Sequence, residues 1–392
     1  MARLRLNADL VLAATLPDHL DEVTEAAERT AVTGDTAPFF AAFRASDLPF
    51  LLNLHGPDAH VAATIASLHA IGERSPGLAL GVSQHMAAML AFGLADGLLS
   101  ADGSTTGVVG TLLEEVFAKR LLVANTTSHA GGDKIGAPGS TITDTESGFV
   151  VNGYSTFLSL ATEADKLVFL TRGRDGNPVG VVTDLVGNPA LRVSDELLFG
   201  DHLVLADTRK VQFANLEVSR ASVIGPDPRL DLFYLVQLAC HNLCVASLYL
   251  GGAHRILEET RQFGLRATLP TGAALATADS FSAALGKLAI EYLGAQHLLR
   301  AAAASVLEIG AAARMEPGTA RDRLLRVSAV KHQVALVIED IATKCRKLVG
   351  ARAFMNGHPV ARIGAEVVFA ALGPATEKLI ERNVGARYLE EV

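Results

Sequence analysis

Two stretches of the sequence place hydroxyl side chains, glycine and an aromatic side chain at close spacing. The first covers residues 126–133 and opens with two threonines. The second covers residues 152–159 and opens with an Asn-Gly pair, a signal for a tight hairpin. The two stretches can therefore lie side by side on neighbouring strands and present backbone amides, hydroxyl groups and an aromatic face to one ligand. We predict that they form half of a site for a planar cofactor, which helices complete.

Two histidines are candidates for acid–base chemistry, because imidazole titrates near physiological pH. His85 lies in the apolar stretch 76–93, where a histidine is more often a hydrogen-bonded core residue than a catalytic one. His241 is flanked by Cys240 and Cys244. We predict no metal site from these three residues, because His241 points about 100° around a helix from Cys240 and no second ligand cluster is evident.

Composition limits the classes of protein. At 392 residues, 49% hydrophobic and with a mean hydropathy of +0.30, the chain can form two or three domains with a large core. The net charge of -8, without a basic cluster, argues against nucleic acid as a partner. We expect no membrane span, because no uninterrupted apolar run of about 18 residues occurs, and no signal peptide. Three cysteines without paired spacing fit a reducing, cytoplasmic compartment.

The hydrophobic pattern divides the chain into three domains. Residues 1–120 have apolar residues at helical spacing, residues 121–227 contain short β-rich runs such as Leu203–Leu205, and residues 228–392 are helical again. This order predicts an α+β fold class with a small central β-barrel or sandwich. Long apolar faces on helices commonly pack against a second subunit, so we expect a homo-oligomer, either a dimer or a tetramer.

The order of these elements, together with the two cofactor stretches, resembles the acyl-CoA dehydrogenase superfamily. The residues that match its two motifs are Thr126, Ala130, Gly131 and Asp133, then Asn152, Gly153, Phe157 and Ser159. Ala164-Asp165, Lys331 and the stretch 350–360 also fit the family pattern. The resemblance covers about residues 60–385. It implies an acyl-CoA dehydrogenase-like architecture with an N-terminal helical domain, a small β domain and a C-terminal four-helix bundle.

The resemblance implies a flavin cofactor, FAD in the first place and FMN as the alternative. In the family, hydroxyls of the two motifs hydrogen-bond the isoalloxazine ring and the aromatic side chain lies against it. Carried over by position, the expected cofactor contacts are Thr126, Thr127, Gly132, Phe157, Leu158 and Ser159. The family also brings an arginine from a neighbouring subunit to the pyrophosphate. The register favours Arg266 with Thr268 over Arg261, although a solvated arginine at a helix end is the other interpretation.

The catalytic groups of the family are missing from their usual places. Its usual base is a glutamate near the C-terminus, and the matching residue here is Leu372, which cannot accept a proton. Some members carry the base on the first helix of the C-terminal half, and that position falls on His241. The next position, where an arginine normally meets CoA, is Asn242. We therefore expect a carrier-bound or other non-standard acyl substrate rather than an ordinary acyl-CoA.

Three functions fit these residues. The first is flavin-dependent dehydrogenation, with removal of an α-proton by His241 and hydride transfer to flavin N5. The second is a two-component flavin monooxygenase that uses reduced flavin and O2; His85 and Ser159 resemble residues of that branch. The third is a degenerate, non-catalytic member of the family. A flavin reductase or an electron-transfer protein is the expected protein partner of the two enzymes.

Overall fold

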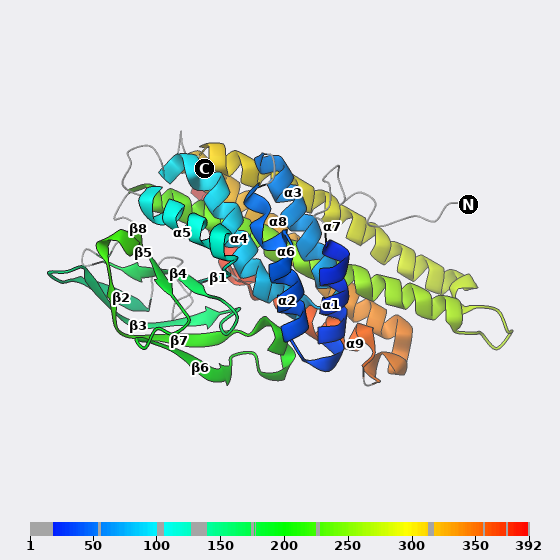
Figure 1. Cartoon of the computed structure of the whole chain (residues 1–392). Coiled ribbons are helices and arrows are strands. Elements are labelled where there is room, and N and C mark those ends of the chain that lie inside the picture. The colour runs from blue at the N-terminus through cyan, green and yellow to red at the C-terminus, as the bar shows by residue number, and fades with distance from the viewer. Residues whose placement is uncertain are drawn as a thin grey trace.

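The computed structural model describes residues 19–53, 56–99, 106–126, 139–173, 176, 178–224, 228–312, 317–355, 357–373 and 375–390. Within these residues helices come first, strands follow and helices return, so the predicted α+β order is confirmed (Figure 1). Two of the expected cofactor contacts, Thr127 and Gly132, lie outside the described residues.

The N-terminal helices pack around α4. The helices are α1 Leu20–Thr33, α2 Ala37–Ala45, α3 Pro57–Arg74, α4 Pro76–Leu99 and α5 Thr106–Lys119. Apolar and small residues occupy every side of α4, so its described side chains are almost all buried. This helix contacts both the sheet at β1 and the C-terminal helix α6, and α3 also packs directly on α6.

The strands form one curled sheet. They are β1 Val123–Thr126, β2 Ser140–Asp144, β3 Phe149–Leu158, β4 Lys166–Arg172, β5 Pro178–Asp184, β6 Leu191–Leu197, β7 Arg209–Val218 and β8 Val223–Ile224. Their order is β6-β7-β3-β2-β4-β5-β8, with β1 parallel to β4. Phe169 on β4 and Phe213 on β7 stack at 4.4 Å although their strands are not neighbours in this order. The sheet therefore closes around a shared interior, as a small barrel or sandwich does.

The run Leu203–Leu205 is not a strand, so the sequence prediction was wrong there. It lies in two short 3-10 turns, and the chain leaves them at Asp207 with φ 47°. The carbonyls of Ala206 and Asp207 accept hydrogen bonds from the Leu160 and Ala161 amides over 3.1 and 3.2 Å. Because this segment bonds a crossing loop rather than a neighbouring strand, its apolar composition does not lead to a ladder.

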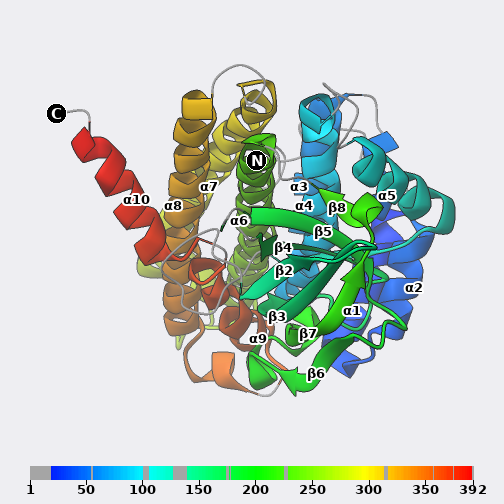
Figure 2. The same cartoon turned by 90° about the vertical axis from the view of Figure 1, so that its left-hand side faces the viewer.

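The C-terminal half is built around one long helix, α6. The helices are α6 Pro228–Arg266, α7 Asp279–Ala312, α8 Pro317–Val349, α9 Pro359–Val367 and α10 Glu377–Glu390. The long helices α6, α7 and α8 pack on one another, and the shorter α9 and α10 lie against α8 (Figure 2). The C-terminal bundle that the resemblance implied therefore consists of three long helices with two short ones at its edge.

Glycines allow α6 to approach α3 closely. A Cβ atom at Gly72 would lie 2.0 Å from the Leu248 carbonyl oxygen, and one at Gly251 would lie 2.1 Å from the His69 carbonyl oxygen. Only a residue without a Cβ atom fits at such a crossing. The two glycines fix the position of α6, and with it that of His241, against the N-terminal helices.

Two helical stretches are long and apolar enough to cross a membrane by length and composition, Pro76–Leu94 and Phe233–Arg266. Of these stretches, 94% and 89% respectively are buried inside the protein. They are core helices, and their high hydropathy reflects contacts on most sides.

Candidate active site

The two hydroxyl-rich segments meet at the end of β1. Thr126 on β1 and Ser155 on β3 place their Oγ atoms 2.5 Å apart, and both side chains are buried. The preceding residue, Asn125, donates from Nδ2 to the Gln84 carbonyl of α4 over 2.6 Å. The two segments meet at Thr126 as predicted, but not on neighbouring strands, because β1 pairs with β4 and β3 lies between β2 and β7. The contact of Thr126 with a cofactor stays a prediction.

Phe157 is exposed at the junction between the sheet and the C-terminal helices. Its exposed fraction is 47%, high for a phenylalanine. Its ring stacks on that of Phe199 at 5.9 Å with 13° between the planes, and Phe199 meets Phe369 edge-on at 5.1 Å. Phe369 follows α9, so the three rings join the sheet to the C-terminal half. The open part of Phe157 offers an apolar face to a planar ligand.

Leu158 and Ser159 are turned into the protein. Leu158 is fully buried in the core, so its side chain cannot be the cofactor contact that we expected, and only its backbone remains available. Ser159 Oγ lies 2.8 Å from Thr208 Oγ1, and both residues are buried. Because a hydroxyl both donates and accepts, Ser159 can hold a ligand atom and Thr208 at the same time.

His85 holds β1 in place with both of its ring nitrogens. Nδ1 accepts from the Val123 amide over 3.0 Å, so the proton is on Nε2, which donates to the Pro49 carbonyl over 2.7 Å. Burial lowers the pKa of His85 to about 4, and the ring stays neutral at neutral pH. No ring nitrogen is free for catalysis, contrary to the sequence prediction. The role of His85 is to fix the strand that carries Thr126.

The Asp165 carboxylate anchors the same strand from its other end. Its Oδ2 atom accepts from the Leu122 amide and from Arg44 Nη1, each over 2.7 Å. Arg44 also donates to the Glu163 carbonyl over 2.6 Å. These bonds join α2 to the start of the parallel pair β1 and β4. The Ala-Asp element of the family pattern is therefore structural here.

His241 is buried in α6 with 6% of its surface exposed. Its Nε2 atom has no hydrogen-bond partner among the residues that the structure describes. Burial lowers the pKa of His241 to about 4, and the positive charge of Lys331 acts in the same direction. A buried nitrogen without a partner costs folding free energy unless a ligand or a water bonds it. His241 is therefore a candidate to contact a ligand.

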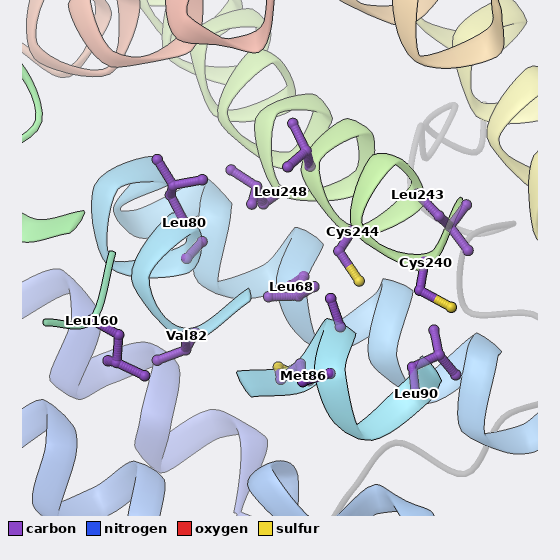
Figure 3. Close-up of a cluster of buried hydrophobic side chains, with 14 of the residues drawn as sticks. Leu68, Leu80, Val82, Met86, Leu90, Leu160, Cys240, Leu243, Cys244 and Leu248 are labelled. Carbon is purple, nitrogen blue, oxygen red and sulfur yellow. The ribbon is translucent and has the colours of Figure 1, made fainter. Parts of the chain in front are cut away.

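The flanking cysteines face away from this site. Cys240 and Cys244 pack towards Leu90 and Leu68 of the α4 and α3 core (Figure 3). Burial raises the pKa of both thiols, so neither forms a thiolate near neutral pH. They are packing residues, as the helical spacing indicated.

The loop after α9 approaches α6 beside His241. Val245 follows His241 by one helical turn, and a Cβ atom at Gly373 would lie 3.3 Å from Val245 Cγ1. Gly373 follows Leu372, which is 60% exposed. The position where the family carries its usual base therefore lies about one helical turn from His241.

Lys331 and Asn242 extend this site into a buried polar cluster. Lys331 is 2% exposed, and its Nζ donates to the Ala375 carbonyl over 3.1 Å. Burial lowers the pKa of Lys331 to about 8. Asn242 donates from Nδ2 to Ser328 Oγ over 3.0 Å, while its Oδ1 has no partner within the described part of the chain. An ammonium, a free amide oxygen and a free imidazole nitrogen are together suited to a small polar ligand group.

Two charged core residues were not recognised as site residues from the sequence. Lys331 interrupts the buried stripe of α8 between Val327 and Val334, and a charge on such a stripe is the signal that could have revealed it. Glu366 on α9 accepts from the Gly77 amide at the start of α4 over 2.7 Å, and burial raises its pKa to about 7. The spacing of Glu366 carries no comparable signal, because its partner is distant in sequence.

Arg266 and Thr268 lie at the far end of α6. Arg266 is the last residue of this 39-residue helix, is exposed, and makes no ion pair with any residue that the structure describes. Its rival Arg261 is paired with Glu258 over 2.7 Å. A helix of 39 residues spans about 58 Å. In Figure 1 α6 runs from the side of the sheet to the opposite end of the helical half. The contact of Arg266, at the C-terminal end of α6, with the cofactor of a neighbouring subunit stays a prediction.

One cluster among the described residues has ligand atoms close enough for a metal ion: His332, Glu377 and Glu381, within 4.8 Å of one another. Each ring nitrogen of His332 faces a different carboxylate, at 3.5 Å and 3.7 Å. Because the two carboxylates face different ring nitrogens, they are not arranged to share one ion with a single nitrogen of His332. The sequence prediction of no metal site stays a prediction.

Comparison with known proteins agrees with this architecture. A family model described as acyl-CoA dehydrogenase, C-terminal domain, matches residues 235–386. Butyryl-CoA dehydrogenase from Megasphaera elsdenii superposes with a TM-score of 0.77 at 14% identity, over 96% of this chain and 99% of that one. The family match covers the C-terminal part of the chain, and the chain as a whole has the acyl-CoA dehydrogenase-like fold. The resemblance predicted from the two motifs and from the order of the elements is confirmed.

Two other proteins of similar fold are not named as dehydrogenases. FMN-bound TdsC from Paenibacillus sp. A11-2 has a TM-score of 0.78 at 18% identity, over 95% of this chain and 98% of that one. KijD3 in complex with dTDP has a TM-score of 0.77 at 18% identity, over 99% and 97%. At these identities the likeness establishes the fold alone. No match to a curated protein sequence was found.

The residues at the sheet surface fit a flavin. Phe157 leaves an aromatic face open, and the hydroxyls of Thr126 and Ser159 lie at the ends of β1 and β3 with capacity for further hydrogen bonds. His85 and Asp165 fix the strand that carries Thr126. The surface is thus held rigidly by residues that need not touch the cofactor themselves.

Proposed function

We propose that this protein is a flavin-dependent oxidoreductase that dehydrogenates a carrier-bound or other non-standard acyl compound, with His241 as the base. The observation that carries this proposal is the free, buried Nε2 atom of His241 beside the loop of Leu372. Leucine stands where the family has its usual carboxylate, and the imidazole of His241, one helical turn before Val245 on α6, can accept a proton in its place.

The neighbours of His241 support proton removal next to a carbonyl group. The pKa of His241 is lowered to about 4, so the ring is neutral and has a lone pair at neutral pH. Protonation of a buried base with such a low pKa is costly, so proton transfer to His241 requires stabilisation of the charge that develops on the substrate. If the substrate carbonyl lies near Lys331, the ammonium stabilises the negative charge that develops as the α-proton leaves. Flavin, when bound, supplies the acceptor for the electron pair.

Asn242 sets the class of substrate. An amide at this place lacks the charge that an arginine offers to the CoA moiety, and its Oδ1 atom needs a donor. A thioester on a carrier, or a neutral acyl compound with a hydroxyl or amide near the reacting carbon, meets this requirement. The other partners that we propose are an electron-transfer protein and a second copy of the chain, which would bring Arg266 to the cofactor.

The direct test of the proposal is anaerobic bleaching of the flavin-loaded protein by acyl thioesters. His241→Ala should keep the flavin and lower the bleaching rate by about 10²–10⁴. The control is Cys244→Ala, one turn away on the core side of α6. Equal bleaching by His241→Ala and the parent protein would reject His241 as the base.

A second function, a reduced-flavin monooxygenase, is favoured by a different observation. Leucine at position 372 removes the carboxylate and leaves an apolar, exposed side chain in its place. Related structures are described as FMN-bound, and one of these proteins as a dibenzothiophene monooxygenase. In this case thioesters would not bleach the flavin, and oxygen consumption would require a flavin reductase. An absorbance spectrum, followed by denaturation and identification of the released FAD or FMN, separates both enzymes from a member that binds no flavin.

A further inference from the structure

A groove lies on the outer face of the sheet, over β3, β6 and β7. Its volume is about 550 Å³. The three strands are neighbours in the sheet (Figure 1), and their side chains alternate between the interior and this face. Among its lining residues Arg192, Lys210 and Gln212 are exposed and face away from the barrel interior, and the groove is separate from the polar cluster around His241.

The strand register brings two cations and several amides to this groove. Arg192 on β6 is opposite Gln212 on β7, and Gln212 is opposite Tyr154 on β3. Lys210, two residues before Gln212, projects on the same side, because side chains alternate along a strand. Asn152 lies two residues before Tyr154 and also lines the groove. The groove therefore presents two positive side chains, Arg192 and Lys210, next to the side-chain amides of Gln212 and Asn152.

The cations of the groove carry no counter-charge. Neither Arg192 nor Lys210 makes an ion pair with a described residue, while the neighbouring Arg209 is paired with Asp207. Lys210 Nζ instead lies over the Tyr154 ring, 4.4 Å from its centroid. This cation–π contact orients the ammonium without neutralising it. On a chain with a net charge of -8, two unpaired cations in one groove form a local anion-binding surface.

We propose that this groove binds the phosphate group of a small phosphate ester. Arg192 offers a planar fork for two phosphate oxygens, and Lys210 offers a point charge held in place by Tyr154. The amide of Gln212 and the Nδ2 group of Asn152 can bond polar atoms next to the phosphate, while Asn152 Oδ1 accepts from the Asn215 amide over 2.8 Å. An inorganic anion alone would leave these amides unused, so the ligand is an ester with a polar organic part.

The groove borders the flavin surface proposed above. On β7 Lys210 lies between Arg209, opposite Leu158, and Val211, opposite Ser155. It is therefore the cross-strand neighbour of the segment that contains Phe157. The phosphate can belong to the flavin itself or to a separate nucleotide or pantetheine ester. The proposal goes beyond the proposed function, because binding of a separate ester would persist even if the chain held no flavin.

Calorimetric titrations of the full chain test the proposal with matched pairs of ligands: FMN and riboflavin, AMP and adenosine, phosphopantetheine and pantetheine. At least one phosphorylated ligand should bind tenfold or more tightly than its partner, and the responding pair identifies the source of the phosphate. Arg192→Gln with Lys210→Gln should abolish this difference. The control is Lys287→Gln, an exposed lysine on α7.

Two outcomes would overturn the proposal. One is the absence of any preference for a phosphorylated ligand in all three pairs. The other is a preference that survives in the double variant. Both substitutions are at exposed strand positions, so folding should be kept, and circular dichroism verifies this. As a second variant, Tyr154→Leu should weaken phosphate binding about threefold by releasing Lys210, with both charges retained.

Discussion

Val245 on α6 packs against Gly373 of the loop after α9: a Cβ atom at Gly373 would lie 3.3 Å from Val245 Cγ1. This contact brings together two alternative places for a catalytic base. One is His241, a turn before Val245, and the other is Leu372, directly before Gly373. The chain has an imidazole at the first place and no proton acceptor at the second.

Introducing a carboxylate at position 372 tests whether that position can carry the base. In a His241→Ala background, Leu372→Glu should raise the rate of flavin bleaching by a thioester at least about tenfold. Leu372 is 60% exposed, so the substitution should cost little folding free energy. Stopped-flow absorbance measures the rate. Leu372→Gln has the same shape without a base, and an equal gain from it would contradict the shared site.

Glu366 should make stability depend on pH. Burial raises the folded-state pKa of Glu366 to about 7, above its ordinary value of 4.5, so the folded state binds more protons between these values and stability falls as pH rises through them. Glu366→Gln keeps an acceptor for the Gly77 amide and removes this loss. The variant should gain about 2–3 kcal/mol over the parent above pH 7 and much less at pH 5. Thermal unfolding at pH 5 and pH 8 measures the difference, and an equal shift at both would refute it.

His85 should matter for stability rather than for proton transfer. His85→Leu leaves the Val123 amide and the Pro49 carbonyl buried without partners, at a cost of about 2–4 kcal/mol in the free energy of unfolding. Urea unfolding measures this cost. His297→Leu, at an exposed position of α7, should change stability by less than about 0.5 kcal/mol. A fully stable His85→Leu protein without activity would instead assign His85 to catalysis.

Phe157 should affect flavin retention more than folding. Phe157→Ala removes an exposed ring, so we expect a loss of at least about 1 kcal/mol in flavin binding with a small change in melting temperature. Equilibrium dialysis of the flavin gives the affinity. The matched control is Phe354→Ala, another phenylalanine with 68% of its surface exposed. The flavin surface would be misplaced if both variants retained flavin equally well.

The crossing of α3 and α6 should tolerate no side chain at its centre. Gly251→Ala places a Cβ atom 2.1 Å from the His69 carbonyl oxygen, so the helices must separate at a cost of several kcal/mol. Gly294 on α7 has nothing within 4 Å of its Cβ position, and Gly294→Ala should stabilise the helix by up to about 1 kcal/mol. Thermal unfolding should therefore move in opposite directions for the two variants. A shift of the same sign for both would contradict the close crossing.

Local sequence patterns predict the elements of this fold because each pattern has a direct physical cause. Apolar residues at steps of three and four along α8 bury one helix face. The tight hairpin predicted at the Asn-Gly pair of 152–153 was wrong, because both residues lie inside β3, paired with Thr141 and Ser140 of β2, and the turn between the two strands is at 145–148. The run Leu203–Leu205 shows the limit of such reasoning. Its composition suits a strand, but no neighbouring strand offers a ladder, and pairing depends on residues distant in the chain.

The site was harder to predict because its residues act through contacts that are distant in sequence. Thr126 and Phe157 could be placed by family resemblance. The pairing of His85 with Val123 and Pro49, which removes it as a base, requires the packed structure. The same holds for Lys331 beside His241, since α6 and α8 are about ninety residues apart in the sequence.

The three thiols of this chain have a practical consequence. Cys240, Cys244 and Cys345 are all free and buried, and burial raises the pKa of each. None can react with an alkylating reagent until the helices around it open. Two of these cysteines lie on α6 and one on α8. Their alkylation rates would therefore measure how fast the helical core opens, separately from any motion of the sheet. The native cysteines can therefore report the rate of local unfolding of the helical core without an added probe.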